Sequence, residues 1–150
     1  MQYLLAQENR ETGTIHIGVV VSDLQKSVDF YTNVVGMKKT GSFTVDANFA
    51  RRSGLSGGEP FEVTGMQLDD KPGATQYKLM SFGRKATHPP RKDIRDDTGI
   101  QYITIFVDDL QPYLDRIRKH HVRLLGDTPI PGGGPGNTFV LIRDPDGTFN

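Results

Sequence analysis

An internal repeat constrains the fold of this chain more than any other feature of its sequence. The segment IGVVVSDLQ, which begins at Ile17, aligns with ITIFVDDLQ, which begins at Ile103, and the pairs 17/103, 21/107, 23/109, 24/110 and 25/111 are identical. The first part of each copy is rich in β-branched residues, which favour strands, and the aspartate that follows is a preferred helix N-cap. The repeat therefore predicts a strand–helix unit that occurs twice in one domain.

The same order of elements follows each copy of the repeat. In the first half, Leu24, Val28, Tyr31 and Val35 recur at the spacing of one helical face. The strands that we expect lie at 14–21, 38–45, 61–68 and 75–82, and then at 99–107, 123–125, 138–143 and after the DPDG turn. The predicted organisation is an N-terminal arm (1–13), a βαβββ module (14–83), a linker (84–98) and a second βαβββ module (99–150) whose last strand is cut short, all in one structural domain.

Composition excludes several classes of function. Eighteen basic residues balance eighteen acidic ones, so neither a nucleic acid nor a membrane surface is an expected partner. Cysteine is absent, so any metal must be held by His, carboxylate, amide or water. Because the chain lacks a long apolar run and a signal-peptide pattern at its start, we expect a cytoplasmic protein.

The alternation of side chains along a strand predicts which residues stay uncovered by the helices. Ile17 and Ile103 have the parity of the helix-covered face, so His16 and Tyr102 lie on the other face. If the two halves curve around a common space, the side chains that line it and bind a ligand are His16, Gln76, Lys78, Met80, Tyr102 and Phe106.

Three segments resemble a known family. HIGVVVSDLQKSVDFYTNVVGMKKTG is similar to the opening of glyoxalases, bleomycin-resistance proteins and extradiol dioxygenases, the vicinal oxygen chelate superfamily. GIQYITIFVDDLQPYLDRI and FVLIRDPDGTF resemble the second module of that family. The resemblance implies an α+β fold in which two βαβββ modules form a curved, partly open mixed sheet barrel around a central cleft. It also implies a small-molecule ligand and a homodimer.

The resemblance further implies a set of metal ligands, which this chain matches only in part. His16 stands at the position of the first ligand, but Lys78 occupies the position of an acidic ligand and Tyr102 that of a histidine. The last glutamate of the family would fall beyond Asn150. Gln76 shares the facing of Lys78 and offers an amide oxygen instead.

Two hypotheses follow for the function. The first is a small-molecule-binding protein of the glyoxalase/bleomycin-resistance type, which holds its ligand without the usual complete metal site. The alternative is a metal-dependent glyoxalase-like lyase, isomerase or dioxygenase, with Zn, Ni, Mn or Fe held by His16, by Gln76 or Tyr102, and by a glutamate beyond residue 150. In an enzyme, the catalytic candidates would be His16, Lys78 and Tyr102.

Overall fold

The computed structural model describes residues 14–150, so the predicted N-terminal arm lies outside the described residues. The first half forms a four-stranded sheet in the order β1-β4-β3-β2, with β1 parallel to β4 and the other neighbours antiparallel. Its elements are β1 (His16–Val20), α1 (Leu24–Phe30), a π-helical segment (Tyr31–Val35), β2 (Lys38–Val45), α2 (Ala47–Arg52), β3 (Phe61–Gln67) and β4 (Gln76–Ser81).

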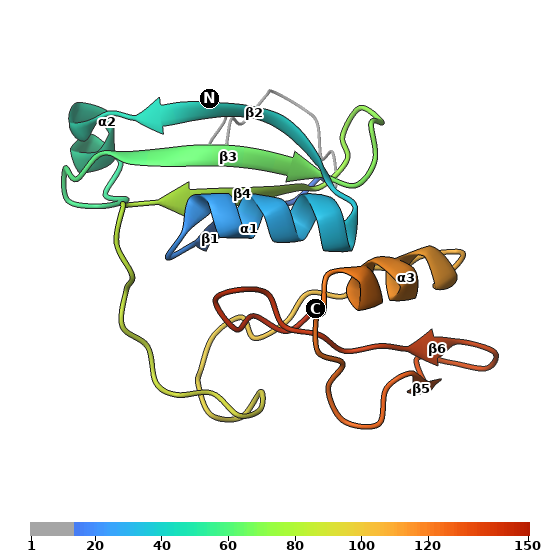
Figure 1. Ribbon diagram of the computed structural model, residues 1–150. Helices are drawn as coiled ribbons and strands as arrows, with labels where there is room; N and C mark the ends of the chain where they lie inside the picture. Colours follow the sequence, from blue (N-terminus) through green and yellow to red (C-terminus); the bar gives the residue numbers. More distant parts are fainter. Residues whose placement is uncertain (1–13) are drawn as a thin grey trace.

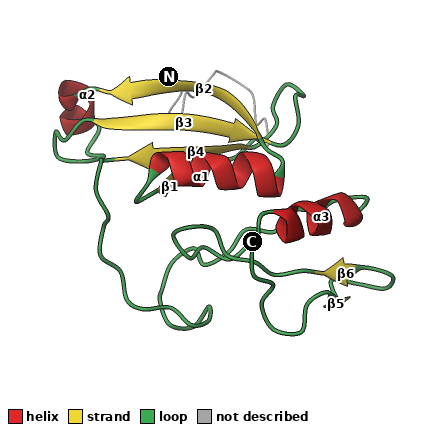
Figure 2. Ribbon diagram, viewed as in Figure 1, coloured by secondary structure: helices red, strands yellow, loops and turns green. Residues whose placement is uncertain are grey.

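Local signals at both ends position the first helix. The Asp23 carboxylate accepts a hydrogen bond from the backbone N–H of Lys26 at 3.1 Å and so caps the start of α1. Gly36 ends the π-helical segment in a left-handed conformation with φ of 89°, which glycine adopts without steric cost. Between these ends the helix covers one face of the sheet, over β1 and β4 (Figure 2).

The second half contains α3 (Gln111–Lys119), β5 (Ile130–Pro131) and β6 (Thr138–Phe139). The strands predicted at 99–107, 123–125 and 138–143 are wrong in extent. Of these residues only Thr138–Phe139 form a strand, β6, and isolated bridges join Tyr102 and Arg143 to Phe149. Tyr102 pairs with Phe149 in parallel and Arg143 pairs with it antiparallel. Tyr102, Phe149 and Arg143 are thus ordered and directed as β1, β4 and β3 are in the first half. The second half therefore repeats that topology, but with far fewer hydrogen bonds between its extended segments.

Burial confirms the predicted facing of both copies of the repeat except at Ile15, which has the same parity as Ile17 but is 65% exposed. In the first copy, Ile17 and Val19 are half-buried while His16 and Gly18 are exposed. In the second copy, the half-buried residues are Gln101, Ile103, Ile105 and Val107, and the exposed ones are Ile100, Tyr102, Thr104 and Phe106. This alternation with a period of two is what an extended segment with one covered face requires.

The two halves share one hydrophobic core. The second half lies beyond β1, the edge strand of the sheet (Figure 1). The helix-facing side chains of both copies pack in the same cluster, which contains Val21, Tyr31, Leu79, Ile117 and Ile142 as buried members. The predicted α+β architecture with a curved, open sheet is therefore confirmed. None of the helices in residues 14–150 combines the length and the apolar composition needed to cross a bilayer.

A buried polar network crosses this core. The hydroxyl of Tyr31 donates a hydrogen bond to the Asp144 carboxylate at 2.8 Å and lies 3.1 Å from the hydroxyl of Tyr77. Asp144 also accepts hydrogen bonds from the backbone N–H groups of Asp146 and Thr148. Burial raises the pKa of Asp144, and burial also raises the pKa of Tyr77 to about 12. Tyr31 thus joins the first sheet to the last turn of the second half.

Replacing Tyr31 by phenylalanine tests this junction. The change keeps the ring but removes the donor, so a buried carboxylate oxygen of Asp144 loses its partner. We expect the free energy of unfolding, measured in urea, to fall by about 1–3 kcal/mol. Tyr113→Phe is the matched control, because Tyr113 is only half-buried and contacts Arg116 through its ring. Equal stability of the two variants would contradict the assigned role of Tyr31.

Candidate functional site

The face of the sheet opposite α1 carries the candidate site. Strand register places its side chains in three rows that run across β1, β4, β3 and β2. The first row is polar and contains His16, Gln76, Gln67 and Lys38; the second contains Gly18, Lys78, Gly65 and Gly41; the third is apolar and contains Val20, Met80, Val63 and Phe43. The face therefore changes from polar to apolar over the length of the strands.

Glycines on both sides make Lys78 the single residue with a side chain in the middle row. Gly18 lies beside it on β1 and Gly65 beside it on β3. A Cβ atom added to Gly18 would come within 3.1 Å of the Met80 side chain, and one added to Gly65 would collide with the Thr40 hydroxyl. The middle row thus has glycines on both sides of Lys78, which is its charged group. We call this strip of the sheet face, with the polar and apolar rows beside it, the groove.

Electrostatics in the groove favour the neutral form of His16. Burial, and next the positive charge of Lys78, lower the pKa of His16 below its usual value. Burial also lowers the pKa of Lys78. Both shifts reflect the cost of holding positive charge in this place, and a negative group that entered the groove would offset that cost.

The apolar row of the sheet face contributes to a second hydrophobic cluster. Its buried members are Val45, Ala50, Phe61 and Val63, and Met80, Phe43, Phe49 and Phe82 pack against them. Met80 therefore contributes to packing as well as to the wall of the groove. The short helix α2 begins at the capping residue Asp46, whose side chain accepts from the backbone N–H of Phe49, and this cap places α2 over the cluster.

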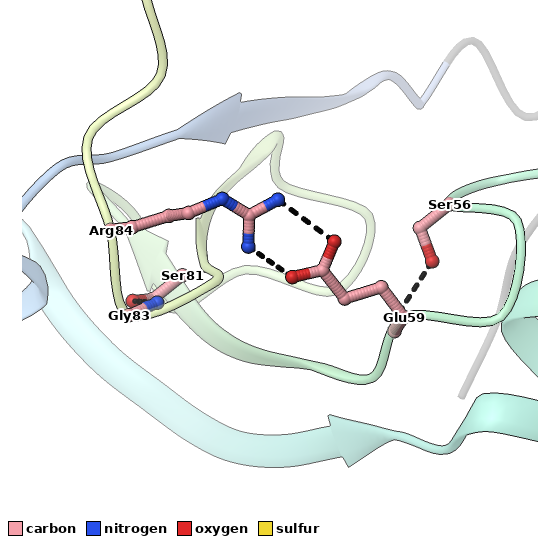
Figure 3. Close-up of polar contacts among 5 residues, drawn as sticks. All are labelled: Ser56, Glu59, Ser81, Gly83 and Arg84. Atoms are coloured by element: carbon pink, nitrogen blue, oxygen red, sulfur yellow. Dashed lines mark hydrogen bonds and ion pairs between the residues drawn. The ribbon is translucent and has the colours of Figure 1, made fainter.

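An ion pair between Arg84 and Glu59 joins two loops beside the apolar row. Arg84, in the predicted linker, makes two hydrogen bonds to the carboxylate of Glu59, and Ser56 donates to the backbone carbonyl of Glu59 (Figure 3). The Arg84 guanidinium also lies 5.7 Å from the ring centroid of Phe82. The pair joins the segment after β4 to the segment before β3.

The structure brings four of the six predicted ligand-binding residues together, namely His16, Gln76, Lys78 and Met80. Tyr102 and Phe106 lie on the second half, where their side chains are 57% and 88% exposed. They face away from the shared core, as His16 does. No hydrogen bond among residues 14–150 joins Tyr102 to the first sheet, and a role for Tyr102 and Phe106 in the site stays a prediction.

Several residues of the groove escaped the sequence argument. The pairing of Gly65 with Lys78 follows from the DDKPGA hairpin, so its position was within reach of the sequence. The position of Thr40 was not, because it depends on a bulge between Lys39 and Gly41 that turns Thr40 over Gly65. Gln67 joins the polar row through the same β3–β4 register.

The donors in the groove do not fit a divalent metal. Among the described residues, no group of three or more His, Cys, Asp or Glu side chains lies close enough to hold a metal ion. His16 is a good ligand and Gln76 a weak one, but the third side chain in reach is the Lys78 ammonium, which has no lone pair and repels a cation. The described residues alone therefore make no cage for a dication at this position.

Comparison with solved structures agrees with the fold. The chain is similar to a glyoxalase family protein from Bacillus cereus, with 21% identity, a TM-score of 0.70, and coverage of 97% of this chain and 94% of that one. It is also similar to the trypanothione-dependent glyoxalase I of Leishmania major, with 19% identity, a TM-score of 0.59, and coverage of 95% and 84%. For glyoxalase I from Zea mays the identity is 18%, the TM-score 0.63, and the coverage 91% and 42%.

Comparison of sequences identifies the family. The comparison with curated proteins gave no match. The family model described as Glyoxalase/Bleomycin resistance protein/Dioxygenase superfamily matches residues 13–150. This match spans nearly the whole chain and confirms the resemblance seen in the repeated segments. The chain belongs to the glyoxalase/bleomycin resistance protein/dioxygenase superfamily.

Proposed function

We propose that this protein binds a small molecule with a negatively charged oxygen group and an apolar body, and that it does so in the groove of the four-stranded sheet. The observation that carries the proposal is the change from a polar row, through the Lys78 row, to an apolar row. A carboxylate placed beside Lys78 would have the imidazole of His16 on one side and the Met80 side chain on the other. Small-molecule sites commonly combine an apolar wall with a few such polar groups.

Binding would involve no covalent step in this proposal. Lys78 supplies charge, and the glycines beside it allow a ligand to approach the backbone of the sheet. His16 and Gln76 supply hydrogen-bonding groups at the polar end. Tyr102 and Phe106 would add apolar contacts from the second half, and the homodimer predicted from the resemblance remains a prediction that sedimentation velocity would check.

One observation favours the metal-assisted enzyme as a second candidate. His16 has a lowered pKa and is therefore mainly neutral near pH 7, which is the form that binds metals. Elemental analysis of untagged protein distinguishes the candidates. Zn, Ni, Mn or Fe in one-to-one ratio, lost in His16→Ala, would support the enzyme and contradict binding by Lys78 charge alone.

The contribution of Lys78 can be measured with a matched pair of probes. The charged probe is 4-phenylbutyrate and the neutral one is 4-phenylbutanol. Lys78→Met should weaken binding of 4-phenylbutyrate by about ten-fold or more in calorimetry, because a charge-assisted contact is lost, and should leave the alcohol unaffected. Lys39→Met, an exposed lysine of the same sheet paired with Met66, is the control. Equal affinity of Lys78→Met and the wild type for the acid would reject the proposal.

The glycines beside Lys78 lead to a second prediction about ligand binding. Gly18→Val puts a side chain into the groove against Met80, so binding of 4-phenylbutyrate should become too weak to measure by calorimetry. The free energy of unfolding should stay within about 1 kcal/mol of the wild type, because valine suits a strand better than glycine does. Retained affinity in a folded Gly18→Val protein would place the ligand elsewhere.

The pKa of His16 reports on the charge in the groove. Lys78→Met removes a nearby positive charge, so the pKa of His16 should rise in an NMR titration, although burial still holds it below the usual value. Saturation of the wild type with 4-phenylbutyrate should also raise it, since a negative neighbour stabilises the imidazolium. The exposed His88 is the internal control. A pKa of His16 that stays the same in Lys78→Met and after saturation with 4-phenylbutyrate would contradict the assigned geometry.

A further inference from the structure

A small cavity lies where the linker crosses the C-terminal end of β1. Its volume is about 100 Å³, and three segments that are distant in sequence supply its walls. Ser22 comes from the turn between β1 and α1, Lys85 and Arg91 come from the linker, and Asp146 and Thr148 come from the last turn of the second half. Val20 also lines the cavity and is the one lining residue that belongs to the three rows of the sheet face.

The walls of this cavity carry more positive than negative charge. Lys85 and Arg91 contribute two cations, and neither takes part in an ion pair among residues 14–150. Asp146 contributes one carboxylate, which already accepts a hydrogen bond from the backbone N–H of Ser22 at 3.0 Å. The carboxylate thus serves to fasten the turn after β1, and the linker cations remain for a separate partner.

Arg91 also carries a buried donor for which the described part of the chain supplies no acceptor. Its Nε is shielded from solvent and makes no hydrogen bond within residues 14–150. A buried N–H of a charged group without an acceptor lowers the stability of the folded protein. The backbone at Arg91 is held in place, because the guanidinium of Arg143 donates to the carbonyls of Arg91 and Lys92.

We infer that this cavity binds a small tetrahedral oxyanion of the phosphate type. A phosphate has acceptor oxygens on all sides, which suits donors that converge from three segments. Arg91 and Lys85 on the wall provide positive charge, and Ser22 and Thr148, which also line the cavity, have hydroxyl groups that can donate hydrogen bonds. A bound anion would hold the linker against both halves of the domain, since each half contributes to the wall.

Titration of the full chain with inorganic phosphate tests the inference. In ¹⁵N-labelled protein, the resonances of the Ser22, Lys85 and Thr148 amides and of Arg91 Nε should shift together and saturate. Acetate, which is planar and offers fewer acceptor oxygens, should bind more weakly at equal ionic strength. Arg91→Met and Lys85→Met should each weaken phosphate binding by about ten-fold.

The control variant comes from the same linker. Arg95→Met removes an exposed cation that already pairs with Asp93 at 3.1 Å, and it should leave phosphate affinity unchanged. Lys85 is exposed, so its variant remains informative even if Arg91→Met fails to fold. Shifts that do not saturate, or an equal loss in Arg95→Met, would overturn the inference. Neither result would bear on ligand binding beside Lys78.

Discussion

The parallel pairing of β1 with β4 is the constraint on which the candidate site depends. This register sets His16 beside Gln76 and Gly18 beside Lys78. A shift of one residue would send Lys78 under α1, where burial of its ammonium group in an apolar core would be costly. The register is held by the opposite face, because Ile17 pairs with Tyr77 and Val19 with Leu79, and all four contribute to the shared core. Packing of the face under α1 thus determines which polar side chains lie side by side on the opposite face of the sheet.

The fold also depends on polar contacts between the two halves. Polar groups inside a core need partners, and here the partners come from distant segments: Tyr31 and Asp144 are 113 positions apart. Arg116 adds a further link, since its Nε donates to the carbonyl of Val34 at 2.9 Å. The linker is fastened as well, through Arg84 to Glu59 and through Arg143 to the backbone at Arg91. These contacts join the two halves and the linker to one another within the described residues.

Much of the fold was accessible from the sequence, because both the repeat and the facing of its side chains depend on local periodicity. The period of two assigned His16 and Tyr102 to uncovered faces, and the period of 3.6 assigned Tyr31 to a covered one. Regular strands in the second half were predicted wrongly, since a ladder depends on its partner and residues 148–150 pair with only a few positions. The Thr40 bulge and the link from Tyr31 to Asp144 depend on tertiary packing, which periodicity does not encode.

The common core has a consequence for how each half could exist by itself. A lone first half would expose Tyr31, Val34 and Val35 on the side of the helix that now meets α3 and the last turn. Such a half could cover these residues only by binding a second molecule. Because both halves belong to one chain, the covering contact forms within one molecule, where the effective concentration of the partner does not depend on expression level.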